Sequence, residues 1–312
     1  MRSPAVRLAV LFVLALVPAC TTRSVGPGRD TGGGTNPGDD TGTGGGGHDA
    51  NFPDLGGGHG PTCSDAAQLI YLVDSNQNLL SYRPDTGALT PIGTLSCAGA
   101  LVTPFSMAVS RDAVAYVLHS DHHIYAVSTS DASCSATPWV IDQMGFEQFG
   151  MGFVSDAAGG TAETLFIAGG PALGIGGGSS TLGSIRVADW SATRIGPLSG
   201  SPELTGNGLG ELWGFFPDTT PMRVRQIDRN DATTIQEYDV SGVTGGVTRR
   251  AAAWAFAYWG GRYYMFYQSL ADTSTGIYRL TPDTGLVEPV MLNIGFRVVG
   301  AGVSTCAPTI LV

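Results

Sequence analysis

Short apolar stretches separated by turn residues fill the chain from residue 61 onward. Each stretch alternates or runs apolar over five to eight residues and stops at Asp-Gly, Gly-Gly or Pro-Asp sequences, which favour tight turns. None keeps the period of about 3.6 residues that marks an amphipathic helix. The pattern therefore predicts an all-β domain over residues 61–312.

These stretches recur as five similar units. The turn-bearing segments are NLLSYRPDTGALTPIG (78–93), HIYAVSTSDASCSATPWV (123–140), SIRVADWSATRIGPL (184–198), RVRQIDRNDATTIQEY (223–238) and GIYRLTPDTGLVEPV (276–290). The strands expected to open the units are 105–112, 149–156, 210–218, 253–261 and 296–304. They start 43 or 44 residues apart, except for one interval of 61 that contains the Gly-rich insert GGPALGIGGGSSTLG. Such a period, with four short strands in each unit, predicts a β-propeller.

The two ends of the domain each hold an incomplete unit. The C-terminus supplies a first strand with nothing after it, and the N-terminus supplies second to fourth strands with nothing before them. Joined, they make one blade, so we expect a single five-bladed ring closed by the C-terminal strand, which leaves no open sheet edge between its ends. A six-bladed ring and a β-sandwich are the alternatives.

Four cysteines of the domain predict two disulfides, for which three pairings exist. Cys306 ends the closing strand and Cys63 precedes the strand that it joins, which favours a Cys63–Cys306 bond. Cys97 and Cys134 lie near the last strands of neighbouring blades. The repeat therefore favours Cys97–Cys134 as the second bond.

The N-terminus predicts export. Residues 1–19 combine two arginines with the apolar run LAVLFVLALV, which is too short to span a bilayer. The sequence VPAC that ends at Cys20 resembles the lipobox of bacterial lipoproteins, and this implies that Cys20 is acylated and anchors the chain to a membrane. Residues 20–60 then form an expected disordered tether, because its Gly, Thr, Pro and Asp residues bury too little surface to fold.

The blade segments are similar to those of bacterial extracytoplasmic β-propeller lipoproteins, in which sequences like YRPDTGALTPIG close each blade. The resemblance covers about residues 61–312. It implies a lipid-anchored protein of the cell envelope. Thr21 follows Cys20 in place of the Asp that is associated with inner-membrane retention in some lipoprotein systems, which favours the outer membrane where the cell has one. Many members have no assigned activity, so the resemblance predicts location and fold rather than chemistry.

Charge and composition exclude several functions. The chain has 26 acidic and 16 basic residues, and every basic residue is Arg. Such an acidic protein is a poor nucleic-acid binder. The absence of Lys excludes a Schiff-base lysine, a Walker P-loop and a Ser-Lys dyad. We expect a monomeric head without a cofactor.

Candidate catalytic groups are few. Glu211 is the one carboxylate expected on an inner strand, and Glu147 precedes another, so these two are the pair to consider for glycoside hydrolysis. The sequence HSDHH (119–123) is typical of a polar hairpin, because alternation directs His122 and His123 to opposite faces. We therefore expect no metal site.

Aromatic residues give the remaining lead. Trp213 and Trp254 belong to strands expected near the channel, where rings bind sugars or peptides, although packing between blades also requires such residues. Glu211, Trp213 and Trp254 form the candidate ligand face. The first hypothesis is a non-enzymatic binding or scaffolding protein with an unknown protein or glycan ligand. The alternative is a carbohydrate-active hydrolase or a lectin-like glycan binder.

Overall fold

The computed structural model describes residues 63–99, 101–171, 178–247 and 249–311. The predicted signal (1–19), the predicted lipidation site Cys20 and the predicted tether (20–60) lie outside these ranges, as does the centre of the Gly-rich insert. In the described ranges the regular structure is β-strand apart from the short 3₁₀ turns η1 (Asp65–Gln68), η2 (Gln143–Gly145) and η4 (Ser241–Thr244). No helix there has the length and apolar character needed to cross a bilayer.

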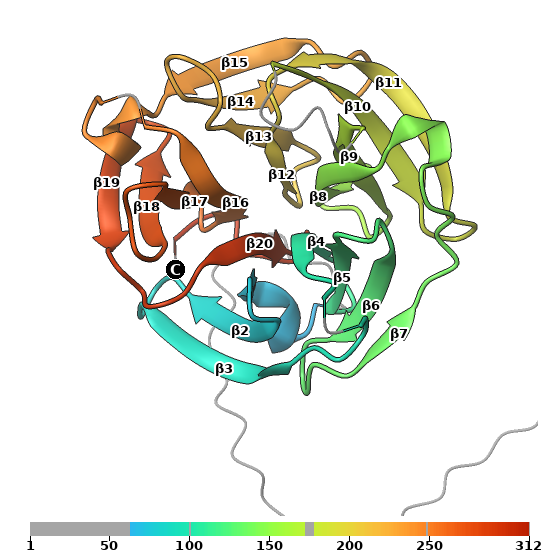
Figure 1. The fold of residues 1–312 in the computed structure, drawn as a ribbon. Coiled ribbons are helices and arrows are strands. Elements are labelled where there is room, and N and C mark those ends of the chain that lie inside the picture. Colours follow the sequence, from blue (N-terminus) through green and yellow to red (C-terminus); the bar gives the residue numbers. More distant parts are fainter. Residues whose placement is uncertain (1–62, 100, 172–177, 248, 312) are drawn as a thin grey trace, which may run out of the picture. The chain divides into compact units, whose positions relative to one another are not determined.

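The described strands form five antiparallel sheets of four strands, arranged as blades around a common centre (Figure 1). From the centre outward, blade 1 contains β20 (Val298–Val303), β1 (Ile70–Asp74), β2 (Asn78–Arg83) and β3 (Ala88–Thr94). Blade 2 contains β4 (Pro104–Val109), β5 (Val114–His119), β6 (Ile124–Ser128) and β7 (Cys134–Ala136). Blade 3 contains β8 (Gln148–Ser155), β9 (Glu163–Gly170), β10 (Ser179–Arg186) and β11 (Ser191–Ser199). Blade 4 contains β12 (Glu203–Gly206), β13 (Leu212–Phe216), β14 (Arg223–Ile227) and β15 (Thr234–Asp239). Blade 5 contains β16 (Ala251–Trp259), β17 (Arg262–Ser269), β18 (Gly276–Thr281) and β19 (Leu286–Met291).

The two ends of the domain meet in blade 1. The C-terminal strand β20 pairs antiparallel with β1, with Ile70 opposite Val303 and Leu72 opposite Ala301. A disulfide joins Cys63 to Cys306, whose Cα atoms are 5.7 Å apart. The five-bladed ring and its closure by the C-terminal strand are thus confirmed, and neither a sixth blade nor a sandwich is present in the described residues.

The prediction of the innermost strand of blade 4 is wrong by one strand. The segment 210–218 forms β13, the second strand, and the inner strand is β12. β12 has only four residues, Glu-Leu-Thr-Gly, and lacks an apolar run. The more apolar LWGFF of β13 is fully buried because it packs between two blades, so it resembled the inner strands of the other units.

The hydrophobic core lies between the blades. Five clusters of buried side chains fill the five junctions of neighbouring blades. In the junction of blades 4 and 5, for example, the rings of Trp213 and Tyr263 are 4.5 Å apart. Because each blade is covered on both faces, its central strands are apolar on both sides and show little alternation.

The inner strands approach one another closely around the axis. A Cβ at Gly150 of β8 would collide with the carbonyl oxygen of Pro202, and one at Gly206 of β12 would collide with that of Phe153. Glycine is therefore required where β8 meets β12. This close contact keeps the centre of the ring narrow.

Candidate functional site

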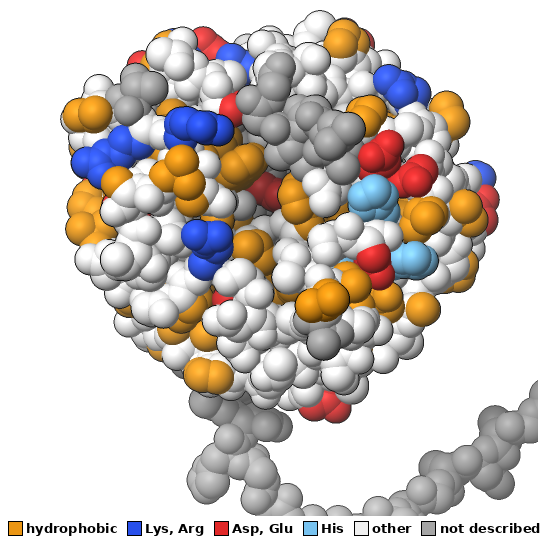
Figure 2. Space-filling model, in the orientation of Figure 1, with side chains coloured by type: hydrophobic (Ala, Val, Ile, Leu, Met, Phe, Trp, Pro, Cys, Tyr) orange, Lys and Arg blue, Asp and Glu red, His pale blue; other side chains and the backbone are white. Residues whose placement is uncertain are grey.

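The ring has two different faces. On one, which we call the top face, the inner strands begin and the second strands end; on the other, the bottom face, the inner strands end. The β5–β6 and β13–β14 connections and the segments that lead into the inner strands lie on the top face, which Figure 2 shows. The segment after β20, residues 304–311, begins on the bottom face.

The C-terminal segment covers the bottom of the ring. Thr305, Cys306 and Ala307 are buried. Further along, the amide of Gly260 donates to the carbonyl of Pro308 at 2.7 Å, and the Tyr258 hydroxyl donates to the carbonyl of Thr309 at 3.1 Å. The segment is thus fixed to blade 5 as well as to the disulfide in blade 1, and it closes this end of the channel.

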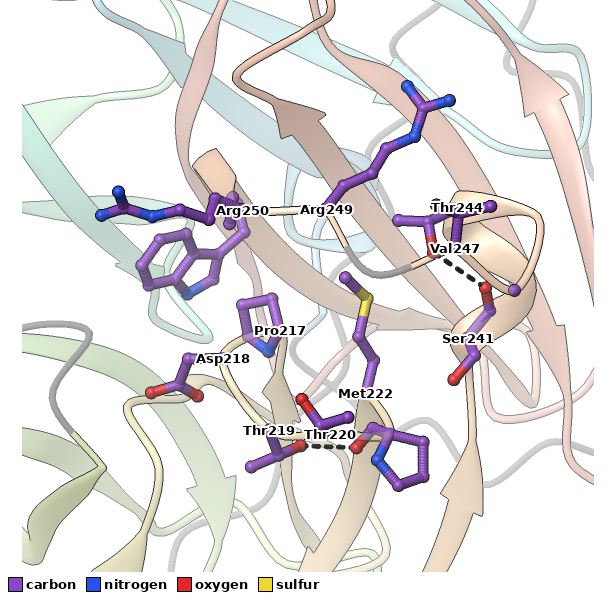
Figure 3. Close-up of a pocket in the computed structure, with 14 residues that line it drawn as sticks. Pro217, Asp218, Thr219, Thr220, Met222, Ser241, Thr244, Val247, Arg249 and Arg250 are labelled. Atoms are coloured by element: carbon purple, nitrogen blue, oxygen red, sulfur yellow. Dashed lines mark hydrogen bonds between the residues drawn. The ribbon is translucent and has the colours of Figure 1, made fainter.

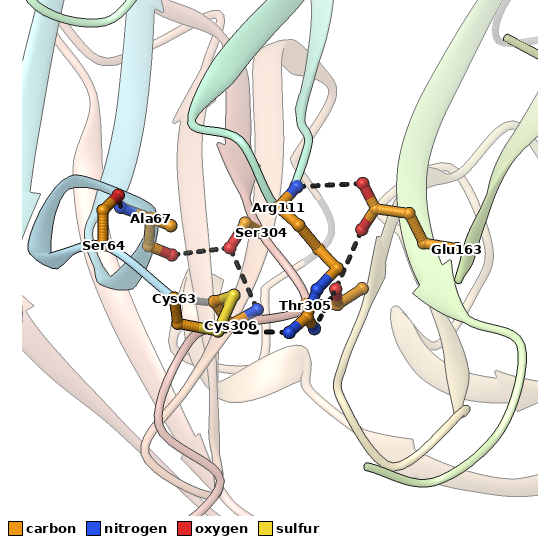
Figure 4. The surroundings of a disulfide bond; sticks show 8 residues. All are labelled: Cys63, Ser64, Ala67, Arg111, Glu163, Ser304, Thr305 and Cys306. Carbon is orange, nitrogen blue, oxygen red and sulfur yellow. Dashed lines mark hydrogen bonds between the residues drawn. A yellow bond between two sulfur atoms is a disulfide. The ribbon is translucent and has the colours of Figure 1, made fainter. Parts of the chain in front are cut away.

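A polar network holds the same segment to blades 2 and 3 (Figure 4). The Arg111 amide donates to Glu163 Oε1 at 2.9 Å, and Thr305 Oγ1 donates to Glu163 Oε2 at 2.8 Å. The guanidinium of Arg111 donates to Thr305 Oγ1 and to Cys63 Sγ, each at 3.2 Å. Burial raises the pKa of Glu163. The network connects blades 2 and 3 to the ring closure at Cys63 and Thr305, which indicates a structural role.

A hollow with a volume of about 550 Å³ lies on the top face between blades 4 and 5. The β13–β14 connection contributes Asp218, Thr219 and Thr220 to it. The segment before β16 contributes Arg249 and Arg250 from another side (Figure 3). The lining residues thus include Ser and Thr residues, one Asp and two Arg.

A second, smaller hollow of about 50 Å³ adjoins the entrance of the channel. Phe105, Gln148 and Phe149 line it together with Glu203. The indole of Trp254 on β16 lines both hollows, so they share one aromatic wall. Both hollows open on the top face, which therefore offers space for a ligand.

Glu203 is the acidic residue that sequence reasoning missed. Its side chain is 4 % exposed and accepts a hydrogen bond from Ser106 Oγ at 2.8 Å and another from the Met151 backbone. Burial raises the pKa of Glu203 well above its usual value. The residue was missed because β12 was not recognised as an inner strand.

The predicted pair of carboxylates is not brought together. Glu211 precedes the second strand of blade 4 on the bottom face, where Asn207 Nδ2 donates to its Oε2 at 2.7 Å and Trp213 Nε1 donates to the same atom at 3.3 Å. Glu147 precedes β8 on the top face. The two therefore lie at opposite ends of the ring, too far apart to flank one bond.

The structure separates Trp254 from the other two residues of the predicted ligand face. Trp213 is 2 % exposed, packs between blades 4 and 5 and donates a hydrogen bond to Glu211 on the bottom face. Trp254 alone of the three lines the top hollows. Arg249 and Arg250 are not among the predicted site residues. The signal that could have identified them is that they are the one pair of adjacent arginines in the sequence and lie just before an expected inner strand.

The histidines of the HSDHH hairpin make local contacts. His119 is fully buried, with Nδ1 3.3 Å from the carbonyl of Val117. His122 Nδ1 lies 2.9 Å from Asp142 Oδ1, and His123 Nδ1 lies 3.4 Å from Asp121 Oδ2. Within the described ranges, no group of three or more His, Cys, Asp or Glu side chains is placed to hold a metal ion.

Comparisons with known proteins give no family. No protein-family model matches the sequence, and no curated protein matches it. Among solved structures, the chain is similar to a protein of unknown function from Bacteroides caccae, with 9 % identity and a TM-score of 0.42 over 76 % of this chain and 98 % of that one. It is also similar to TolB from Acinetobacter baumannii, with 11 % identity and a TM-score of 0.42 over 73 % of this chain and 54 % of that one. The arrangement of the strands itself shows a five-bladed β-propeller of four-stranded blades.

Proposed function

We propose that this protein is a lipid-anchored binding protein of the cell envelope that captures a glycan on the top face of its propeller, without chemical conversion. The two disulfides indicate an oxidising, extracytoplasmic compartment. The lipobox-like VPAC sequence supports an anchor at Cys20.

The observation that carries the proposal is the position of Trp254 between two top-face hollows, while the opposite end of the channel is closed. Indole rings provide broad, rigid faces for sugar rings at little entropic cost. Hydroxyl groups of the neighbouring connection, such as that of Thr220, supply polar contacts. This is the usual make-up of a small-ligand site, with an apolar wall and a few placed polar groups.

The proposal is tested with the full-length protein on an array of envelope and plant-type oligosaccharides. Wild type should bind members of the array, and Trp254→Ala should weaken binding about tenfold or more, whereas Trp254→Phe should restore part of it. Binding that is unchanged in Trp254→Ala would overturn the proposed face. Capture of a protein but of no saccharide would overturn the glycan ligand.

Anchoring is tested separately. Cells that express the wild type should incorporate a labelled fatty acid into the protein and retain it in the membrane fraction. Cys20→Ser should abolish both. Retention of the label in Cys20→Ser would contradict the anchor without affecting the binding proposal.

A carbohydrate-active hydrolase is the second candidate, and Glu203 favours it. A buried carboxyl with a raised pKa at the wall of a hollow suits a general acid. If oligosaccharide cleavage is found, Glu203→Gln should abolish it while binding is kept. Glu211→Gln should have no effect, because Glu211 lies on the closed face.

A further inference from the structure

The hollow between blades 4 and 5 has a positive rim in an acidic protein. The chain has 26 acidic and 16 basic residues, yet the adjacent Arg249 and Arg250 both line this hollow. On the top face, basic side chains gather on one side of the central hollow, and acidic and histidine side chains lie on the other (Figure 2). We propose that the hollow binds an acidic saccharide and that the guanidinium of Arg250 pairs with the sugar carboxylate. This inference rests on the proposed function and adds the ligand class to it.

Most described arginines already have partners for their guanidinium groups. These are Arg111, Arg186, Arg194, Arg223, Arg225, Arg229, Arg262 and Arg279. Arg250 is exposed, and no other described residue forms a hydrogen bond or ion pair with its side chain. A guanidinium presents five N–H donors in a planar fork that matches a carboxylate. These donors are available to a ligand.

Arg249 and Arg250 have different surroundings although they are neighbours in the chain. Their side chains extend in opposite directions (Figure 3). Arg249 Nη1 lies 3.9 Å from Asp272 Oδ1, so part of its charge is balanced within the protein. We therefore expect the ligand carboxylate to pair with Arg250. A substitution of Arg249 is the matched control for a substitution of Arg250.

Asp218 and Trp254 favour a saccharide over an acidic peptide. Both carboxylate oxygens of Asp218 accept the Ser201 amide, at 3.2 and 3.0 Å, which leaves lone pairs for further donors. Sugar hydroxyls are such donors, whereas the ionised side chains of an acidic peptide have no hydrogen to donate to Asp218. The indole of Trp254 offers a face for the C–H groups of a sugar ring. A uronic acid unit combines the carboxylate, hydroxyls and C–H face that these residues require.

The size of the hollow agrees with this ligand. Its volume of about 550 Å³ lies within the range of roughly 300 to 1,000 Å³ that small-ligand sites occupy. It remains open to solvent beside the smaller hollow at Trp254, so a short oligosaccharide has room to extend toward the channel entrance. The site is therefore built for part of a chain rather than for an isolated ion.

The test is calorimetric titration of the full-length protein in detergent with trigalacturonate, with its fully methyl-esterified counterpart and with a neutral galactose trisaccharide. We expect the acid to bind about tenfold more tightly than the ester, because esterification removes the charge that Arg250 pairs with. Arg250→Ala should remove this preference. Arg249→Ala should keep most of it, and Arg297→Ala should keep all of it, since Arg297 is on the same face but does not line the hollow.

Equal affinity for acid and ester, or a preference that persists in Arg250→Ala, would overturn the inference. If neutral sugars bind in a Trp254-dependent way without preference for the acid, the proposed glycan-binding function stands and the acidic ligand fails. If no saccharide binds, both fail. Binding of polyglutamate that depends on Arg250 and displaces trigalacturonate would replace the saccharide with an acidic peptide. Thermal unfolding of each variant separates loss of binding from loss of fold.

Discussion

Ser106 of β4 donates a 2.8 Å hydrogen bond to Glu203 of β12, across 97 residues of sequence. The bond connects blades 2 and 4 near the axis of the ring, and the Met151 backbone of blade 3 contacts the same carboxyl. A single buried acid therefore joins three inner strands. Its protonation should influence stability.

Glu203→Gln should stabilise the protein at neutral pH. Burial raises the pKa of Glu203, so the folded state holds the proton more tightly than the unfolded chain does. The stability from Glu203 is complete below the unfolded pKa of about 4.3 and is lost as pH rises through the folded pKa. The neutral amide avoids this loss.

Urea unfolding of wild type and Glu203→Gln from about pH 4 to pH 8 measures the effect. The gap between the two free energies of unfolding should widen as pH rises. Ser106→Ala is the control and should cost about 1 to 3 kcal/mol by removing a buried partner. Parallel curves for wild type and Glu203→Gln would show that the carboxyl is not perturbed.

His119 should make the free energy of unfolding fall as pH falls, the opposite of the effect of Glu203. It is fully buried, and burial lowers its pKa, so the folded state resists protonation. Its stability contribution is present above the unfolded pKa of about 6.5 and is lost as pH falls toward and through the lower folded pKa. In His119→Phe, which keeps a ring against Tyr125, the loss of stability below about pH 6.5 should be smaller than in wild type.

The control for this prediction is His123→Ala, because His123 lies on the exposed part of the same hairpin. Thermal unfolding midpoints across the acid range give the readout. If the unfolding midpoint of His119→Phe falls with pH as steeply as that of wild type, groups other than His119 cause the loss of stability in acid.

The bond that closes the ring should contribute more stability than the bond between neighbouring blades. Cys63–Cys306 spans 243 residues and Cys97–Cys134 spans 37. Constraint of the unfolded chain grows with loop length, which gives about 5.5 kcal/mol for the first and about 4 kcal/mol for the second. Denaturation of the two double Cys→Ser variants, compared with wild type, should show this order. The reverse order would mean that ring closure depends little on the disulfide.

Gly150→Ala should destabilise the junction of blades 3 and 4. A Cβ at this position would collide with the carbonyl oxygen of Pro202 and lie 2.8 Å from the Cα of Glu203. The inner strands would have to separate, at a cost of about 1 to 3 kcal/mol or more. Gly170→Ala, in the neighbouring strand β9, is the matched control, because a Cβ there meets no atom within 4 Å. Equal melting temperatures for the two variants would contradict the close approach of β8 and β12.

The sequence predicted the architecture well because it is encoded locally. Turn-bearing segments such as 78–93 and 276–290 each form the third and fourth strands of a blade, and the repeat placed Cys63 opposite Cys306. The inner strand of blade 4 was assigned wrongly because its sequence has the weakest strand pattern. Four residues that begin with Glu203 carry no apolar pattern, and only their pairing with β13 identifies them as an inner strand.

The candidate site was harder to predict because it depends on which loops meet across a blade junction. Trp254 was selected for its aromatic ring, and Trp213 for the same reason, yet one lines the top hollows and the other fills the core. Arg250 and Asp218 come from different blades and meet only in the folded ring. The pattern of residues along the chain does not show which loops of neighbouring blades line the same hollow.

The most direct test of the account is hydrogen–deuterium exchange of the full-length protein with and without trigalacturonate. If the top hollow is the binding site, peptides that cover 217–222 and 249–254 should exchange more slowly in the presence of the saccharide, while those that cover 304–311 on the closed bottom face should not change. Protection confined to the bottom face, or to the outer strands of the blades, would contradict the central claim.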